Sequence, residues 1–289
     1  MQVAIWEVNR SRGRKHKHTM LRLLLAVSFL VATTEAFATL PDGRRVNIIK
    51  NDILLGSVGD YIVNRVEELA KSAIAGKGAF SMSIGSGTTV LPLVALADRV
   101  DFDKVHIFFG NERTEGEAAG KCARSGADVF KTLGIPASNL HYVPELPAEE
   151  AATKYESEMR AMPREVVGLC ENTNLPSLDL CLLGSGDDGH CASLYPNSQQ
   201  VIASPGSTNA YLPAEGKGGI TITIDAINSS RNVILSASKA SQSNMARKCL
   251  SWSNAASNHA LPAGMISTSE GAVVEWILTH ESAADLPAL

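Results

Sequence analysis

A histidine that could activate water stands at position 190, directly after a glycine-rich segment. An apolar run at 178–183 leads into Gly-Ser-Gly-Asp-Asp-Gly at 184–189. Glycines let such a loop bend, so the histidine that follows can reach solvent and a ligand. An imidazole accepts a proton near neutral pH, which suits a general base. His190 is therefore the first candidate for catalysis, and Asp188 could orient its ring.

A second candidate site is the turn Gly85-Ser86-Gly87-Thr88-Thr89, which lies between a predicted strand and a predicted helical stretch. Glycines allow the backbone to approach a ligand, and backbone N–H groups and hydroxyls can then face an anion. The turn lacks the lysine of a Walker loop, and a glycine-serine turn on its own is more often only a turn. It is a candidate phosphate cradle.

The spacing of Gly184, Gly186 and Gly189 also matches the G-x-G-x-x-G pattern of dinucleotide-binding proteins. In that role Asp187 and Asp188 would face the pyrophosphate, which is unfavourable. No Asp or Glu follows about 20 residues later to hold a ribose. The match is therefore a coincidence of glycine spacing, and no dinucleotide cofactor is predicted.

The elements around these loops alternate between apolar strands and amphipathic helices. Helices are expected at 54–75, 90–97, 117–133, 148–162 and 239–252, and strands at 79–84, 105–109, 140–143, 178–183, 220–224, 233–236 and 273–278. This alternation predicts an α/β fold with a doubly wound, mostly parallel sheet and flanking helices. Ligands bind beyond the carboxyl ends of the strands in such folds, so loops 85–89, 110–116 and 184–191 should share one pocket.

Composition and charge exclude several classes of protein. The 289 residues are 45% hydrophobic, which is enough for a substantial core. Residues 1–36 hold six Lys or Arg and two Asp or Glu, so the remainder has 20 basic and 28 acidic side chains. A body of this charge has no basic footprint for nucleic acid. The five cysteines form no C-x-x-C pair, so neither a disulfide framework nor a zinc site is expected.

The first 40 residues have the order of a targeting leader. A basic stretch at 10–17 precedes an apolar run at 23–32 and the small residues Thr34 and Ala36. This order predicts a signal peptide cleaved before Phe37. The apolar run is shorter than the roughly 20 residues of a bilayer span, so no stable membrane span is expected once the leader is removed.

The start of the chain could be Met1 or Met20. Residues 35–38 are similar to the leaders of algae with complex plastids, where a Phe follows the cleavage site. That similarity predicts a plastid destination, with the secretory pathway or the cytoplasm as alternatives. Residues 41–289 contain no repeat or low-complexity linker and are expected to form a single domain.

Residues 178–196, L-D-L-C-L-L-G-S-G-D-D-G-H-C-A-S-L-Y-P, resemble the signature of the 6-phosphogluconolactonases. The resemblance covers most of residues 46–285 in order and spacing. That family belongs to a broader group of Rossmann-like sugar-phosphate enzymes that includes the amino-sugar-6-phosphate deaminases, so the resemblance implies a Rossmann-like fold. After the histidine this chain continues Ala-Ser-Leu-Tyr-Pro, which is similar to the lactonase pattern rather than to the Asn-Glu-Pro of the deaminases.

The resemblance implies hydrolysis of 6-phospho-D-glucono-1,5-lactone to 6-phosphogluconate in the oxidative pentose phosphate pathway, with no metal and no cofactor. It implies His190 as general base, with Asp188 and Arg113 assisting. Backbone N–H groups of the loop that holds Gly186 and Gly189 would stabilise the oxyanion. The residues implied for phosphate or sugar contact are Gly85, Ser86, Gly87, Thr88, Asn111, Glu112 and Lys239.

Several positions depart from the family pattern. Asn111 stands where the family usually has Asp, and Gly219 occupies the place of an arginine expected to contact phosphate. Loss of a guanidinium from such a site costs about 2 kcal/mol or more of binding. Two alternatives therefore remain: a diverged homologue that binds a sugar phosphate or regulates a partner, and a deaminase-like enzyme. The expected partner is a small-molecule sugar-phosphate lactone, and the sequence leaves the oligomeric state open.

Overall fold

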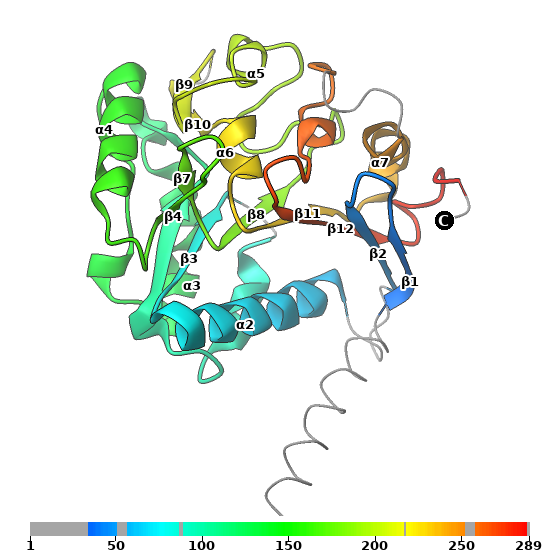
Figure 1. Ribbon diagram of the computed structural model, residues 1–289, viewed down its shortest axis with the longest axis horizontal. Helices are drawn as coiled ribbons and strands as arrows, with labels where there is room; N and C mark the ends of the chain where they lie inside the picture. The colour runs from blue at the N-terminus through cyan, green and yellow to red at the C-terminus, as the bar shows by residue number, and fades with distance from the viewer. Residues whose placement is uncertain (1–33, 51–56, 87–88, 217, 252–257, 288–289) are drawn as a thin grey trace, which may run out of the picture.

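The computed structural model describes residues 34–50, 57–86, 89–216, 218–251 and 258–287. Its central layer is a seven-stranded sheet in the order β1-β2-β12-β11-β8-β3-β4 (Figure 1). These strands are β1 (Thr34–Thr39), β2 (Arg45–Ile49), β3 (Phe80–Ile84), β4 (Val105–Phe109), β8 (Leu180–Gly184), β11 (Asn232–Ala237) and β12 (Val273–Thr279). β1 pairs antiparallel with β2, and every other neighbouring pair is parallel. The predicted α/β, doubly wound and mostly parallel sheet is confirmed.

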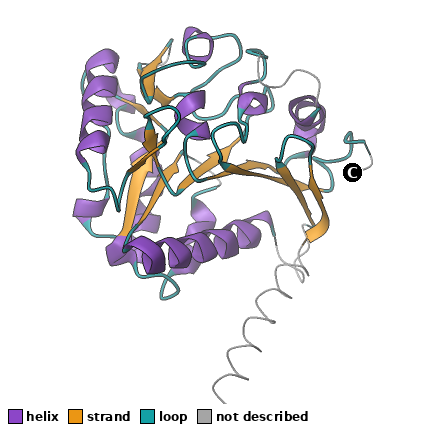
Figure 2. Ribbon diagram, viewed as in Figure 1, coloured by secondary structure: helices purple, strands orange, loops and turns teal. Residues whose placement is uncertain are grey.

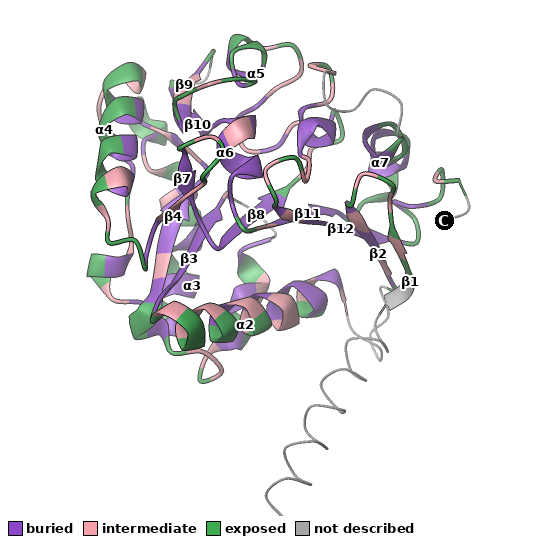
Figure 3. Cartoon of the chain, in the orientation of Figure 1, coloured by how far each residue is buried: buried purple, intermediate pink, exposed green. Residues whose placement is uncertain are grey.

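Helices cover both faces of this sheet (Figure 2). The α-helices are α2 (Val58–Lys77), α3 (Lys121–Leu133), α4 (Ala148–Ala161), α5 (Gln199–Ile202), α6 (Ile224–Asn228) and α7 (Ser243–Leu250). Figure 3 shows buried residues along the central strands and exposed residues on the outer sides of α2 and α4. None of the helices in the described ranges is long and apolar enough to cross a membrane.

The longest helix in the described ranges, α2, begins and ends at residues that favour helix termini. Ser57 and Asp60 form a capping box at its N-terminus, and Gly78 ends it with a left-handed φ of 89°. The helix is fixed to the sheet by an ion pair between Arg65 Nη2 and the buried Glu275 Oε1, 2.7 Å apart. The prediction placed this helix at 54–75, and residues 51–56 lie outside the described part of the chain.

A second, three-stranded sheet lies beside the main one. It contains β5 (Asn111–Arg113), β9 (Tyr211–Ala214) and β10 (Gly219–Ile222) in the antiparallel order β5-β10-β9, and α4 packs against β9 and β10. The strand predicted at 220–224 therefore belongs to this small sheet. A two-stranded sheet pairs β6 (Gly168–Leu169) with β7 (Pro176–Ser177).

Several predicted elements differ from the structure. The helix expected at 117–133 is interrupted, because the 3-10 helix η3 (Gly116–Ala118) and the left-handed Gly120 precede α3. The strand expected at 140–143 is wrong, because only Leu140 makes a parallel bridge, to Ile107. His141 then stacks on Phe108 with ring centroids 4.3 Å apart, and Pro144 has no N–H to extend a ladder. Residues expected as a helix at 90–97 form the 3-10 helix η1 (Leu91–Leu96), which begins next to a proline. The helix expected at 239–252 starts as the 3-10 helix η5 (Ala240–Gln242) before α7, and residues 252–257 are outside the described ranges.

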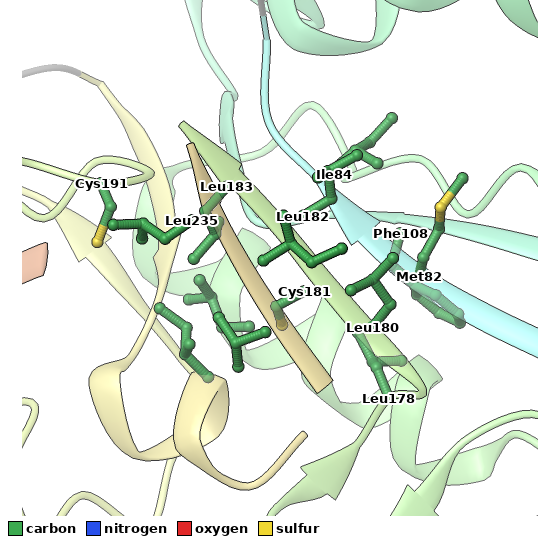
Figure 4. Packing of buried hydrophobic residues seen from close by; sticks show 14 of the residues in the cluster. Met82, Ile84, Phe108, Leu178, Leu180, Cys181, Leu182, Leu183, Cys191 and Leu235 are labelled. Atoms are coloured by element: carbon green, nitrogen blue, oxygen red, sulfur yellow. The ribbon is translucent and has the colours of Figure 1, made fainter. Parts of the chain in front are cut away.

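β8 lies in the middle of the core and leads directly into the candidate catalytic loop. Residues 180–183 of this strand are buried on both faces of the sheet, as expected for a parallel strand covered on both sides. Figure 4 shows β8 between β3, which carries Met82 and Ile84, and β11, which carries Leu235. Burial ends at Gly184, the exposed last residue of β8, and the candidate catalytic loop follows it.

Candidate active site

Four adjacent parallel strands, β11, β8, β3 and β4, end at the same edge of the main sheet. Lys239 follows β11, the loop 185–191 follows β8, the turn 85–89 follows β3, and Asn111 follows β4. Neighbouring strands lie about 4.8 Å apart, so these four segments begin within roughly 15 Å of one another. The structure thus brings the three predicted loops together at one edge and adds Lys239 to them.

His190 and Asp188 form the centre of this site. The His190 ring Nδ1 lies 2.6 Å from Asp188 Oδ1, and the His190 backbone N–H donates to the same oxygen at 3.1 Å. Burial alone would raise the pKa of the Asp188 carboxyl, but these hydrogen bonds from His190 hold its pKa below the usual value. The carboxylate can only accept, so Nδ1 carries a proton, and in the neutral ring Nε2 then keeps its lone pair. The ring is 33% exposed and can meet a solute.

The two glycines of this loop have different physical roles. A Cβ on Gly186 would lie 2.2 Å from His190 Nδ1 and 2.6 Å from Asp188 Oδ1, so only glycine leaves room for the pair. Gly189 has a φ of +86°, which favours glycine, and its carbonyl accepts from the Ala263 N–H at 2.9 Å. The Gly186 N–H donates to the His190 carbonyl and the Gly189 N–H to the Gly186 carbonyl. These two N–H groups of the loop 184–189 are therefore used to shape the loop.

Two further side chains from the signature segment contact the site. The ring of Tyr195 lies 4.9 Å from that of His190, centroid to centroid, at an angle of 37°. Ser193 is buried, and its hydroxyl accepts from the amide of Asn111 at 3.0 Å. Asn111 therefore joins the start of β5 to the segment that follows His190. The signature segment 178–196 contains Tyr195 and Ser193, but the sequence gave no indication of their contacts with His190 and Asn111.

Glu112 is buried, and backbone N–H groups occupy its carboxylate. It is 3% exposed, and its carboxylate accepts from the backbone N–H groups of Arg113, Cys122 and Ala123, each at 2.8 Å. Two of these donors lie in the first turn of α3, where unpaired N–H groups would otherwise attract an anion. The Glu112 carboxylate thus takes the place of an external anion at the N-terminus of α3 and caps the helix.

The candidate phosphate turn is described in part. Ser86 is exposed, whereas Gly87 and Thr88 lie outside the described residues. Gly85 lies beside Asn111, because a Cβ on it would be 3.6 Å from Asn111 Oδ1. The turn and β5 are therefore neighbours. Lys239 is exposed at the end of β11.

Gly219 has a structural explanation. It lies opposite Arg113 in the β5–β10 pair, and a Cβ on it would be 2.0 Å from the carbonyl oxygen of Glu112. No side chain fits at this position while the two strands are paired. The arginine expected here from the family pattern is thus excluded by the local backbone. Across the described ranges, no three His, Cys, Asp or Glu side chains gather closely enough to hold a metal ion.

Comparisons with known proteins identify the family. The family model "Glucosamine-6-phosphate isomerases/6-phosphogluconolactonase" matches residues 57–276. A rice protein named "Probable 6-phosphogluconolactonase 3, chloroplastic" is 30% identical over 246 residues, which cover 80% of this chain and 74% of that protein. The 6-phosphogluconolactonase of a Nostoc strain is 32% identical over 187 residues, 61% of this chain and 71% of that one. The crystal structure of 6-phosphogluconolactonase from Thermotoga maritima shares the fold, with a TM-score of 0.60, 22% identity, and coverage of 81% of this chain and 98% of that one. The chain therefore belongs to the glucosamine-6-phosphate isomerase and 6-phosphogluconolactonase family.

Proposed function

We propose that this protein is a carboxylic-ester hydrolase that converts 6-phospho-D-glucono-1,5-lactone to 6-phosphogluconate in the oxidative pentose phosphate pathway. One observation carries the proposal: the 2.6 Å His190–Asp188 pair, at the strand ends where Ser86 and Lys239 also lie. The names of the rice and Nostoc relatives support it. The Ala-Ser-Leu-Tyr-Pro sequence after His190 favours the lactonase over the deaminase branch.

In the proposed mechanism His190 acts as general base through Nε2. It takes a proton from water as the water oxygen forms a bond to the lactone carbonyl carbon C1. The tetrahedral oxyanion then collapses, the bond from C1 to the ring oxygen breaks, and His190 returns the proton to that oxygen. Asp188 keeps the ring in the required tautomer and stabilises the imidazolium while it exists. Arg113 stabilises the oxyanion, a contribution of about 3 kcal/mol for a well-placed donor.

The phosphate is held at the other end of the substrate. Ser86, with Gly87 and Thr88 of the same turn, and the ammonium of Lys239 bind it from the ends of β3 and β11. The catalytic loop follows β8, which lies between these two strands. Phosphate binding therefore places C1 beside His190, so it supports turnover as well as affinity.

The test is lactone hydrolysis by residues 37–289, with product-specific detection of 6-phosphogluconate and a no-protein control for spontaneous hydrolysis. Ammonia release from glucosamine 6-phosphate is measured on the same preparation. We expect lactone hydrolysis above background and no ammonia. Hydrolysis at background would leave the diverged, binding-only homologue as the better account, and ammonia release would favour the deaminase branch.

We further propose that residues 1–40 contain a targeting leader, cleaved before Phe37, that directs a single lactonase-like domain to a plastid. The chloroplastic rice relative supports this destination. Cleavage before Phe37 would leave Phe37, Ala38 and Thr39 of β1 to pair with β2. Fusion of residues 1–45 to a fluorescent protein tests the proposal. Fluorescence in the plastid is expected, and fluorescence in the secretory pathway or cytoplasm would contradict it.

A further inference from the structure

One buried glutamine joins the two segments that carry His190 and Lys239. Gln242 ends η5 and is 2% exposed. Its Oε1 accepts from the backbone N–H of Lys239 at 2.8 Å, and its Nε2 donates to the backbone carbonyl of Ser185 at 2.6 Å. The Gln242 backbone N–H also donates to the Lys239 carbonyl at 2.9 Å. Both polar groups of the Lys239 backbone are thus bonded to this one residue.

The contact at Ser185 reaches His190 through the loop backbone. Ser185 forms an antiparallel bridge with Cys191, and the next residue, Gly186, donates its N–H to the His190 carbonyl at 2.8 Å. The Ser185 N–H donates to Ser236 of β11 at 3.0 Å. The Gln242 amide adds a connection from Ser185 to the segment beyond the end of β11. A shift of this amide would therefore move the base of the catalytic loop relative to Lys239.

The proposed substrate is held at two separate points, which is why a connection between their binding groups matters for the reaction. The phosphate and the scissile carbonyl lie at opposite ends of the sugar, so the groups that bind them must keep a fixed separation. A misplacement of about 1 Å between reacting groups can lower a rate about 100-fold. We propose that Gln242 is a positioning residue that sets the separation between Lys239 and His190, and so makes phosphate binding productive for hydrolysis. This inference rests on the proposed lactonase function.

The test is the substrate preference of Gln242→Met, which keeps the length of the side chain and removes both amide bonds. Activity is measured on the phosphorylated lactone and on glucono-1,5-lactone, which has no phosphate to hold. Loss of positioning should lower kcat/KM for the phosphorylated lactone by about 10- to 100-fold, with a much smaller change for the other substrate. A merely structural role would lower both rates by the same factor.

Gln200 provides a matched control. It is also 2% exposed, and its amide also joins two backbone groups, donating to the Ser193 carbonyl at 2.9 Å and accepting from the Glu215 N–H at 3.3 Å. Gln200→Met should lower the thermal midpoint about as much as Gln242→Met and leave the substrate preference unchanged. An unchanged preference in a folded Gln242→Met variant overturns the inference, even though the parent is an active lactonase.

Binding of 6-phosphogluconate, measured by calorimetry, separates the inference from the proposed function. If the parent binds the product but hydrolyses no lactone, the proposed function fails. At least 10-fold weaker binding by Gln242→Met would then still support the positioning of Lys239, and equal affinity would overturn it. A parent that neither binds nor hydrolyses overturns both.

Discussion

Substitution of Gly186 by alanine tests whether the geometry of the His190–Asp188 pair controls the reaction. The added Cβ would lie 2.2 Å from His190 Nδ1, 2.3 Å from its Cε1 and 2.6 Å from Asp188 Oδ1. Ordinary contacts of a Cβ begin near 3.4 Å. The ring must therefore move by about 1 Å, and a displacement of that size costs about 100-fold in rate.

The substitution should affect activity much more than stability. The His190 ring is 33% exposed and can turn toward solvent, so we expect a loss of about 1 kcal/mol in the free energy of unfolding. The assay compares kcat/KM for the phosphorylated lactone with the urea unfolding midpoint of the same preparation. Gly184→Ala is the matched control, because its Cβ would meet Thr89 Cγ2 at an ordinary 3.6 Å. Parental activity in a folded Gly186→Ala variant would refute the reasoning.

Three other substitutions test the fold around the site. Glu275→Ala removes the buried partner of Arg65 and leaves this arginine only the 58% exposed Glu68, so it should cost about 3 kcal/mol in urea unfolding. Glu68→Ala removes the exposed partner instead and should cost less than about 1 kcal/mol. Equal losses for the two variants would contradict this difference. Gly219→Arg should lower the thermal midpoint without lowering KM for the phosphorylated lactone, because its Cβ would overlap the backbone oxygen of Glu112, 2.0 Å away. A lower KM at an unchanged midpoint would show that β5 and β10 can separate to admit the side chain. Burial lowers the pKa of His141 to about 4, so between pH about 6.5 and 4 the unfolded chain binds a proton that the folded chain does not. The free energy of unfolding should therefore fall as the pH is lowered through this range. His141→Gln should make this pH dependence weaker in urea unfolding, and an unchanged pH dependence would disprove the assignment.

The parallel core could be predicted because its strands are continuous apolar runs. The strand expected at 105–109 matches β4, and that expected at 273–278 matches β12 to within one residue. The small antiparallel sheet was not predicted as a unit, because β5 and β10 are three and four residues long and pair across a gap of about a hundred positions. Strands that short carry too little periodicity to be recognised.

The part of the candidate site whose side chains lie close together in the sequence could be predicted. Asp188 and His190 are two residues apart, and the glycine spacing around them already indicated a ligand-facing loop. Long-range contacts could not be predicted in the same way. Glu112 was expected to contact substrate, but it caps a helix that starts nine residues later. The Gln242 contact spans 57 positions and leaves no pattern in the sequence.

The most direct test of the central claim, that His190 is the general base, is chemical rescue of His190→Ala with imidazole. Product-specific lactone hydrolysis is measured for the parent and the variant, each with and without added imidazole, and against the spontaneous rate. The mechanism predicts that the parent exceeds background, the variant does not, and imidazole restores part of the variant's rate while leaving the parent unchanged. A His190→Ala variant that hydrolyses the lactone at the parental rate would contradict it.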